Sequence, residues 1–401
     1  MKTAIVAGLK TLRQANILML GPVLVLLVLG VLFVYSACYV GDDKMVRPLY
    51  ERQIVWMIAG LVSYVIFALY DFHRFKRISW GVYGGSLALL LLVLIMGKTI
   101  YGAKRWLMLF GDNGIGIQPS EIAKLSMIIL LSHRLSEVGR NLSSPRELAM
   151  TLGLIAVPVA LIMNQPDLGT ALVFVPTAFL MMYVAGVPFR YLGALGGGGL
   201  LLVGLLLGSL FLPVRMGASE PTQMRIRSLT GLSDYQCGRI EVFFHPDKDP
   251  LGAGWNKRQS EIAVGSGGLR GKGYLHGTQN ILGFLPRSVA PTDFIYSVIA
   301  EEQGFVGSLV VLLLFGTVII FGMMTALRTR DSMGRLLCVG VVSLIFCHVF
   351  INIAMTVGLM PITGLPLPLL SYGGSFMIVT MSALGIVQSV YIRSHRRDAY
   401  Q

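Results

Sequence analysis

The sequence predicts an all-α polytopic membrane protein with about ten transmembrane helices. Of its 401 residues, 54% are hydrophobic and only 13% are charged, about half of the roughly 25% charged residues typical of globular chains. The mean hydropathy is +0.71, and many stretches of about 18 or more residues carry almost no charge, which indicates membrane-spanning helices. These observations exclude a soluble enzyme, a disordered chain and a fibrous repeat.

Ten apolar segments follow one another along the chain and carry this prediction. The first is too long for the core of a signal peptide, and no convincing cleavage site follows it, so we expect an uncleaved anchor. No internal repeat and no soluble domain interrupts the pattern, which predicts one membrane-embedded domain over residues 1–401. The segments lie near residues 17–40, 53–70, 79–97, 119–132, 147–163, 168–185, 191–212, 293–327, 334–359 and 372–392.

The formal net charge of +13 is typical of chains that bind nucleic acid, but the positions of the charges indicate membrane topology instead. With a cytoplasmic N-terminus, Lys and Arg are numerous in the inner connections and sparse in the short outer ones, which is the positive-inside pattern. An even number of spans returns the C-terminus to the cytoplasm. We therefore expect two cytoplasmic termini and no nucleic-acid partner. The basic residues of the short outer connections are Lys44, Arg47, Arg52, Lys98, Lys104 and Arg105.

Two stretches interrupt the series of spans. Residues 213–292 form a long outer loop, and loops of this length in a compact protein are functional or disordered. Its aromatic residues and apolar runs favour an ordered loop, with a helix from Trp255 to Val264 that ends at glycine-dense sequence. Residues 360–374 are rich in Pro and Gly and carry no charge. Such backbone is tolerated at membrane depth only inside protein or along a cavity, which predicts a re-entrant or interfacial turn at the outer face.

Ionisable residues inside spans are costly and mark function by default. Glu121 and Lys124 lie three residues apart in the short segment that begins at Pro119, so they share one helical face. Either they form a self-neutralising ion pair that lets the helix sit in the membrane, or they belong to a binding site. The sequence leaves both interpretations open.

Four further cations lie near the predicted outer face: Lys104 and Arg105 beside Trp106, and Arg270 and Lys272 beside a run of glycines. Cations together with bare backbone N–H groups suit a phosphate or pyrophosphate. The alternative is a solvated loop and a membrane anchor, because basic residues beside Trp are common at a bilayer edge.

Asp293 opens the eighth span and is the most informative single residue. A partly desolvated carboxylate has a raised pKa and suits general-base work. The competing interpretation is an N-cap, since Thr and Asp commonly cap helices. Glu301 and Glu302 follow two turns later, as a proton path or as partners for Lys or Arg of inner helices. These residues alone do not separate an enzyme from a transporter.

Eight blocks of the sequence, in order, resemble the SEDS family (shape, elongation, division and sporulation). One of them is Thr292-Asp293-Phe294-Ile295, and together they extend over nearly the whole chain. The blocks at 265–279 and 366–375 are more similar to the elongation branch of the family than to its division branch. The blocks are 102–106, 118–124, 165–170, 249–254, 265–279, 292–295, 301–304 and 366–375.

The resemblance implies a peptidoglycan glycosyltransferase with ten spans that polymerises lipid II at the outer face of the bacterial cytoplasmic membrane during elongation. It implies a class B penicillin-binding protein, a transpeptidase, as partner, along with other membrane proteins of the elongation complex. Asp293 matches the catalytic aspartate of the family. Glu121 and Lys124 match residues that line the same cavity, and Arg105 lies in a matching block.

The expected chemistry is one inverting displacement in which Asp293 acts as base and the pyrophosphate leaves. Cations near the leaving group, or a divalent ion such as Mg²⁺ or Mn²⁺, would stabilise it, although no Cys and His spacing typical of a metal site is present. Two rival functions are a lipid II flippase and a non-catalytic scaffold for the transpeptidase. The chain departs from the family at 287–291, which lacks the usual acidic residue and His, and at Cys237-Gly238, where basic or polar residues are common. The expected substrate-binding cations are Lys104, Arg105, Lys124, Arg270 and Lys272, with Arg105 and Lys124 favoured.

Overall fold

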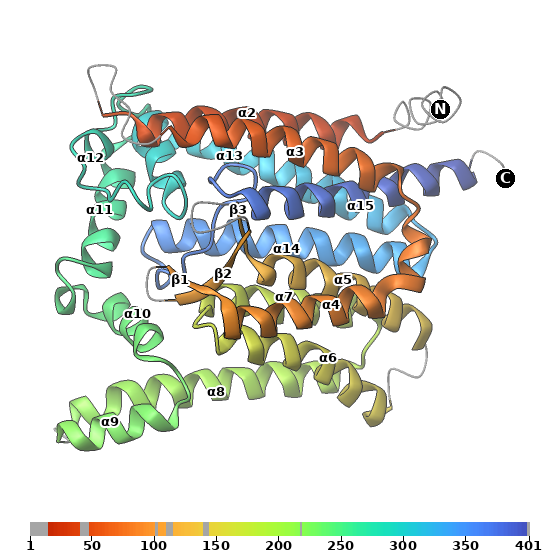
Figure 1. Ribbon diagram of the computed structural model, residues 1–401, viewed down its shortest axis with the longest axis horizontal. Coiled ribbons are helices and arrows are strands. Elements are labelled where there is room, and N and C mark those ends of the chain that lie inside the picture. The colour runs from red at the N-terminus through yellow and green to blue at the C-terminus, as the bar shows by residue number, and fades with distance from the viewer. Residues whose placement is uncertain are drawn as a thin grey trace.

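In the computed structural model the long helices run side by side as one bundle, and a group of shorter helices gathers at one end (Figure 1). The structure describes residues 15–40, 48–100, 103–109, 115–138, 144–216 and 219–398; Lys44, Arg47 and Gly102, used above, lie outside these ranges. The long helices match the ten predicted segments in order. They are α2 (Ile17–Cys38), α3 (Leu49–Leu69), α4 (Phe75–Met96), α5 (Pro119–Val138), α6 (Pro145–Met163), α7 (Leu168–Ala185), α8 (Phe189–Arg215), α13 (Ile295–Arg328), α14 (Ser332–Thr356) and α15 (Gly374–Asp398).

Within the described ranges, nine helices are long and apolar enough to cross a membrane. The one remaining predicted span, near residues 119–132, corresponds to α5. This helix has 20 residues but includes Glu121, Lys124 and Arg134. It is buried along nearly its whole length. A helix that carries charge at membrane depth must be shielded by neighbours, and α5 is shielded by α4, α7 and α14.

Burial divides the bundle into a centre and a periphery. In the most apolar window of α14, 83% of the residues are buried, whereas in that of α8 the fraction is 6%. α8 therefore lies at the edge of the bundle, as Figure 1 shows. Because α14 is surrounded by protein, the polar side chains that it carries can face other helices instead of lipid.

The predicted outer loop is ordered in its described part and helical in several pieces. The helix expected from Trp255 to Val264 is confirmed as the middle of α11, which continues to Ser266. These pieces lie at the end of the bundle opposite to the start of α2 and the end of α15 (Figure 1). The shorter elements are η1 (Phe72–Arg74), α9 (Glu220–Leu229), α10 (Asp234–Phe244), η3 (Pro246–Lys248), α11 (Ala253–Ser266) and α12 (Thr278–Ile281).

A small antiparallel sheet between α4 and α5 adds strands to the otherwise helical chain. It consists of β1 (Lys98–Ile100), β2 (Ala103–Leu109) and β3 (Ile115–Ile117), in the order β1-β2-β3. Trp106 pairs with Lys98, and Leu107 pairs with Ile117. The sheet places Arg105 near the outer end of the bundle.

Two breaks in helical backbone shape this end. Residues 357–373 form turns between α14 and α15 with buried Leu365, Leu367 and Leu370, so the expected irregular segment is confirmed and lies inside protein. The second break is Gly304 within α13, where φ is 64° and ψ is −161°. A Cβ on Gly304 would lie 2.3 Å from the backbone nitrogen of Gly271, so glycine is required for the outer loop to pack into the break.

Candidate active site

Asp293 lies in the turn before α13, and three hydrogen bonds fix the backbone around it. Asn352 of α14 donates from Nδ2 to the carbonyl oxygens of Asp293 (2.9 Å) and Leu365 (2.7 Å). The Ser371 hydroxyl donates to the carbonyl of Thr292, and the Tyr372 N–H donates to the carbonyl of Pro291 over 2.8 Å. The irregular segment 357–373 is thus the support on which the aspartate is held.

The N-cap interpretation of this region is wrong. The N-cap of α13 is Phe294, and no side chain caps the helix. The Thr292 hydroxyl donates instead to the carbonyl of Val289 over 3.2 Å. The half-buried carboxylate of Asp293 therefore does not cap the N-terminus of α13.

Gly364 lies close to this carboxylate. If Gly364 carried a Cβ, that atom would lie 3.3 Å from Asp293 Oδ2 and 3.5 Å from Arg239 Nη1. The φ of Gly364 is +74°, a conformation that a residue with a side chain rarely adopts. Asp293 and Arg239 therefore face each other over a backbone position with no side chain.

Arg239 projects from α10, which begins with a capping box of Ser233 and Gln236. It donates from Nη1 to the carbonyl of Ile362 (2.6 Å) and from Nη2 to the Tyr235 hydroxyl. Its guanidinium also lies over the Tyr235 ring, 4.6 Å from the ring centre. Because 235 and 239 are one helical turn apart, α10 presents both side chains to the same place.

Arg105 of β2 approaches the same ring. Its guanidinium carbon lies 5.9 Å from the centre of the Tyr235 ring. Its Nη2 donates to the carbonyl of Pro166 over 2.8 Å, and its Nη1 lies 3.6 Å from Asp167 Oδ1. Tyr235 thus contacts two arginines, and the three side chains form a cationic wall next to Asp293.

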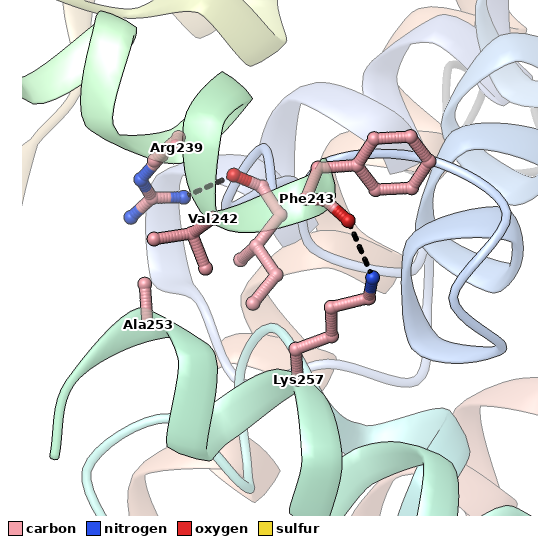
Figure 2. A pocket seen from close by; sticks show the side chains of 6 residues that line it. Arg239, Val242, Phe243, Ala253 and Lys257 are labelled. Atoms are coloured by element: carbon pink, nitrogen blue, oxygen red, sulfur yellow. Dashed lines mark hydrogen bonds between the residues drawn. The ribbon is translucent and has the colours of Figure 1, made fainter. Parts of the chain in front are cut away.

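The other side of Arg239 borders a small pocket between α10 and α11. Figure 2 shows Arg239 and Phe243 on one helix and Ala253 and Lys257 on the next. Lys257 Nζ donates to the carbonyl of Phe243 over 2.8 Å. Hydrogen bonds and packing thus hold both cations of this pocket in place, which fixes α10 over the segment 357–373.

Electrostatics make Asp293 a stronger base than an exposed aspartate. Burial raises the pKa of its carboxyl, and this effect exceeds the opposing attraction of the Arg239 and Arg105 cations. The nearby Asp167 carboxylate acts in the same direction as burial. A carboxylate with a raised pKa accepts a proton from a sugar hydroxyl more readily than an exposed one does.

Glu121 and Lys124 form a buried ion pair on α5. Lys124 Nζ lies 2.8 Å from Glu121 Oε1 and 2.8 Å from His348 Nε2, and the side chains of the pair are 1% and 3% exposed. His348 lies one turn before Asn352 on α14. The pair is therefore linked through α14 to the backbone of Asp293, but its ammonium is enclosed.

The remaining predicted cations bond elsewhere. Lys104 Nζ donates to the carbonyls of Leu94 (2.9 Å) and Ile95 (2.8 Å) at the end of α4. Lys272 Nζ lies 2.6 Å from Glu301 Oε1, and Arg270 is exposed beside the break of α13. Among the described residues, no hydrogen bond or ion pair joins these three to Asp293.

Glu301 and Glu302 are fully enclosed, and each has a partner. Glu301 binds Lys272 of the outer loop, and Glu302 accepts a hydrogen bond from the Ser36 hydroxyl of α2. Of the two expectations for this pair, a Lys partner is found for Glu301, although it comes from the outer loop and not from an inner helix.

The acidic groups around Asp293 do not assemble a metal site. Asp167 is engaged by Arg105, Gln118 and Thr170. Across the described ranges, no three His, Cys, Asp or Glu side chains gather as metal ligands. In these ranges the positive charge next to Asp293 comes from arginines.

Sequence reasoning missed Arg239, Tyr235, Asn352 and Gly364. The spacing of Tyr235 and Arg239 is a helical signal, but nothing local indicates that α10 covers Asp293. Cys237, noted as a departure, is buried with Ile240 against Leu210 of α8. It packs α10 onto the bundle and turns the Tyr235 and Arg239 side chains toward the site.

The fold and the site define a class: a multi-pass membrane protein with a half-buried carboxylate and an arginine pair at the end where its long loop lies. A family model described as "Cell cycle protein" (FtsW, RodA, SpoVE) matches residues 16–396. The chain belongs to this family, which is the SEDS family indicated by its motifs.

Similar proteins agree with this membership over nearly the full chain. The peptidoglycan glycosyltransferase RodA of Treponema pallidum is 34% identical, over 94% of this chain and 97% of that protein. The peptidoglycan glycosyltransferase MrdB of Escherichia coli K12 is 37% identical, over 93% of each. A solved chain from a peptidoglycan synthase complex, described in terms of coordinated polymerization and crosslinking, matches with a TM-score of 0.71 and 31% identity over 96% of this chain and 99% of that one. The crystal structure of RodA from Thermus thermophilus matches with a TM-score of 0.66 and 28% identity over 96% of this chain and 98% of that one.

Proposed function

We propose that this chain is a peptidoglycan glycosyltransferase that polymerises lipid II at the outer face of the bacterial cytoplasmic membrane during cell elongation. The family membership and the names of its relatives support this function. The single observation that carries it is the carboxylate of Asp293, which caps no helix and faces Arg239 over the bare backbone of Gly364.

Asp293 acts as the general base in this reaction. It removes the proton from the 4-hydroxyl of an incoming lipid II, and that oxygen forms a bond to C1 of the lipid-linked glycan strand. The bond between C1 and the diphosphate oxygen breaks, and undecaprenyl diphosphate leaves with the electron pair. One displacement inverts the anomeric centre. The three hydrogen bonds around Asp293 keep the base in one position throughout.

The other site residues of the proposal act around this step. Arg105 contributes positive charge through the wall that it forms with Tyr235. Glu121 and Lys124 support the position of Asp293, since their ion pair is enclosed and is linked to Asp293 through α14. Lys104 and Lys272 act at the margin of the site, because carbonyls of α4 and Glu301 already bind them, and exposed Arg270 is available to the substrate at the surface of the loop.

A class B penicillin-binding protein, which cross-links the new strands, is the proposed partner. The similar chain from a synthase complex that coordinates polymerization and crosslinking supports this pairing. Other membrane proteins of the elongation complex complete the expected assembly. We also propose that residues 1–401 form a single membrane-embedded domain.

The test uses the full chain purified in detergent, with fluorescent lipid II and with or without the transpeptidase. Products are separated on a gel that resolves glycan length, and a muramidase digest serves as identity control. Wild type is expected to give a muramidase-sensitive ladder, and Asp293→Ala and Asp293→Asn are expected to give none. Asp247→Ala is the matched control, because this loop carboxylate is 84% exposed.

The outcomes separate the three functions. A ladder from Asp293→Asn would remove this residue from the role of base. No ladder from wild type, even with partner and divalent cations, would contradict the polymerase. A vesicle assay for lipid II translocation would then decide between a flippase and a scaffold.

A further inference from the structure

We propose that Arg239, which lies beside Asp293 next to Gly364, binds the diphosphate of the lipid-linked substrate. The inference rests on the proposed function and deepens it, because it assigns the leaving group to a residue outside the family motifs noted above. Both Asp293 Oδ2 and Arg239 Nη1 lie within 3.5 Å of the position that a Cβ on Gly364 would take. A substrate bound next to Gly364 would therefore meet the base and a guanidinium close together.

Within the described ranges, Arg239 is not in a close ion pair, whereas the other nearby cations are. Arg105 lies 3.6 Å from Asp167, and Lys124 lies 2.8 Å from Glu121. Among the described residues, no carboxylate lies within 4.0 Å of Arg239, which donates to a carbonyl oxygen and a hydroxyl. The carboxylate that faces the guanidinium is that of Asp293, which becomes neutral when it takes the proton, so the positive charge of Arg239 is then free to act on the diphosphate. The carbonyl oxygen and the hydroxyl also leave part of its five N–H donors unused.

Tyr235 holds the guanidinium in position. Its hydroxyl accepts from Arg239 Nη2, and its ring lies under the same group. The carbonyl of Ile362 fixes the other end of the fork. A guanidinium whose plane is set in advance loses little conformational freedom when it binds two oxygens of a phosphate.

The chemistry needs a cation at this place. When the bond between C1 and the diphosphate breaks, the leaving oxygen keeps the electron pair and gains negative charge, while the proton of the attacking hydroxyl goes to Asp293. A guanidinium that donates to the diphosphate stabilises this charge as it develops. Arg239 therefore favours both binding of the diphosphate and its departure.

The test measures binding and turnover on the same full-length preparations. Binding of undecaprenyl diphosphate is compared with that of undecaprenyl monophosphate for wild type, Arg239→Gln, Arg239→Lys and Asp293→Asn. Arg258→Gln is the matched control, since this arginine lies on α11, pairs with exposed Asp247 and has a side chain that is 47% exposed. Lipid II polymerisation is assayed in parallel.

Arg239→Gln is expected to lose about ten- to hundredfold of its affinity for undecaprenyl diphosphate, the range of one charge-assisted hydrogen-bonding group. It should also lose most of the preference for diphosphate over monophosphate. Arg239→Lys should lose less, Asp293→Asn should bind at least as tightly as wild type because a negative charge beside the site is removed, and Arg258→Gln should bind like wild type. If folded Arg239→Gln bound undecaprenyl diphosphate as tightly as wild type does, and wild type polymerised lipid II, this inference would be overturned and the proposed function would stand. Diphosphate binding that depends on Arg239 in a wild-type protein that does not polymerise would overturn the proposed function and leave this site standing.

A second measurement needs no variant. Phenylglyoxal modifies accessible arginines, and mass spectrometry locates each modified residue in the wild-type chain. Undecaprenyl diphosphate is expected to protect Arg239 and to leave Arg258 reactive, while the monophosphate protects Arg239 less. Equal modification of Arg239 with and without the diphosphate would overturn the inference even if Arg239→Gln failed to fold.

Discussion

Asn352 joins the carbonyl of Asp293 to the carbonyl of Leu365 through one amide group. Asn352 is fully buried, and it links the turn before α13 to the segment 357–373. The candidate base is therefore positioned by a residue one helical turn from His348, the partner of Lys124.

Asn352→Leu is expected to destabilise the protein by about 1–3 kcal/mol, because two buried carbonyls lose their donor. Polymerisation should fall further than stability alone explains, since the backbone of Asp293 is released. Thermal unfolding and lipid II polymerisation, measured well below the midpoint of unfolding, check both effects. Asn164→Leu is the control, because exposed Asn164 bonds only the carbonyl of Ala160. Equal losses in the two variants would contradict a positioning role for Asn352.

Gly364→Ala is expected to abolish polymerisation. The new methyl group would lie 3.3 Å from Asp293 Oδ2 and would crowd the carboxylate. Gly231→Ala is a matched control, because Gly231 has a φ of +68° and no atom within 4 Å of the position of its Cβ. Both variants carry a backbone strain of roughly 1–2 kcal/mol. A Gly364→Ala protein that is no more impaired than Gly231→Ala would show that substrate does not bind next to Gly364.

Polymerisation is expected to fall as the pH is lowered through the raised pKa of Asp293, because only the ionised carboxylate accepts a proton. The Arg239 cation lowers this pKa against the larger effect of burial. Arg239→Gln should therefore raise the pKa further and move the acidic limb of the pH profile to higher pH. Rates of lipid II polymerisation, each normalised to its own maximum, are compared across pH with Arg258→Gln as control. An acidic limb that stays in place in Arg239→Gln would indicate that another group controls it.

Lys124→Met is expected to cost about 3–5 kcal/mol of stability, the cost of leaving one member of a buried ion pair alone. The double variant Glu121→Gln, Lys124→Met removes both charges and should recover most of this loss. Thermal unfolding in detergent measures the recovery, and polymerisation by the double variant then reports function. Full activity in a recovered double variant would make the pair purely structural, and lost activity would assign it to the site.

Hydropathy was enough to find the spans because their cause is local. Nine of the long helices in the described ranges contain a strongly apolar stretch, and each of the ten predicted segments overlaps one observed helix. The short sheet was missed because β1 and β3 have three residues each, too few to show an alternating pattern. Residues 360–374 were expected to be irregular because Pro and Gly act on the backbone at their own positions, and the observed segment is 357–373.

The candidate site was predictable only in part because it depends on distant contacts. Asp293 stood out through its position at the border of a span and its family motif. Arg239 did not stand out, since its place in the site depends on contacts with Ile362 and Gly364. These residues lie more than a hundred positions further along the chain. Lys104 and Lys272 carried the expected charge, but only the fold shows that carbonyls of α4 and Glu301 already bind them.

The break at Gly304 divides α13 into two parts with different surroundings. The longer part, after the glycine, spans the bilayer and must tilt as lipid thickness changes. The shorter part begins next to Asp293 and is held by the outer loop, which packs against the break. Just after the break, the Phe305 and Val306 N–H groups donate to the carbonyls of Gly268 and Leu269. The outer loop therefore fastens both parts of α13, and a change in tilt of the long part is passed on to the end that carries the base. Polymerisation should accordingly depend on the thickness of the bilayer.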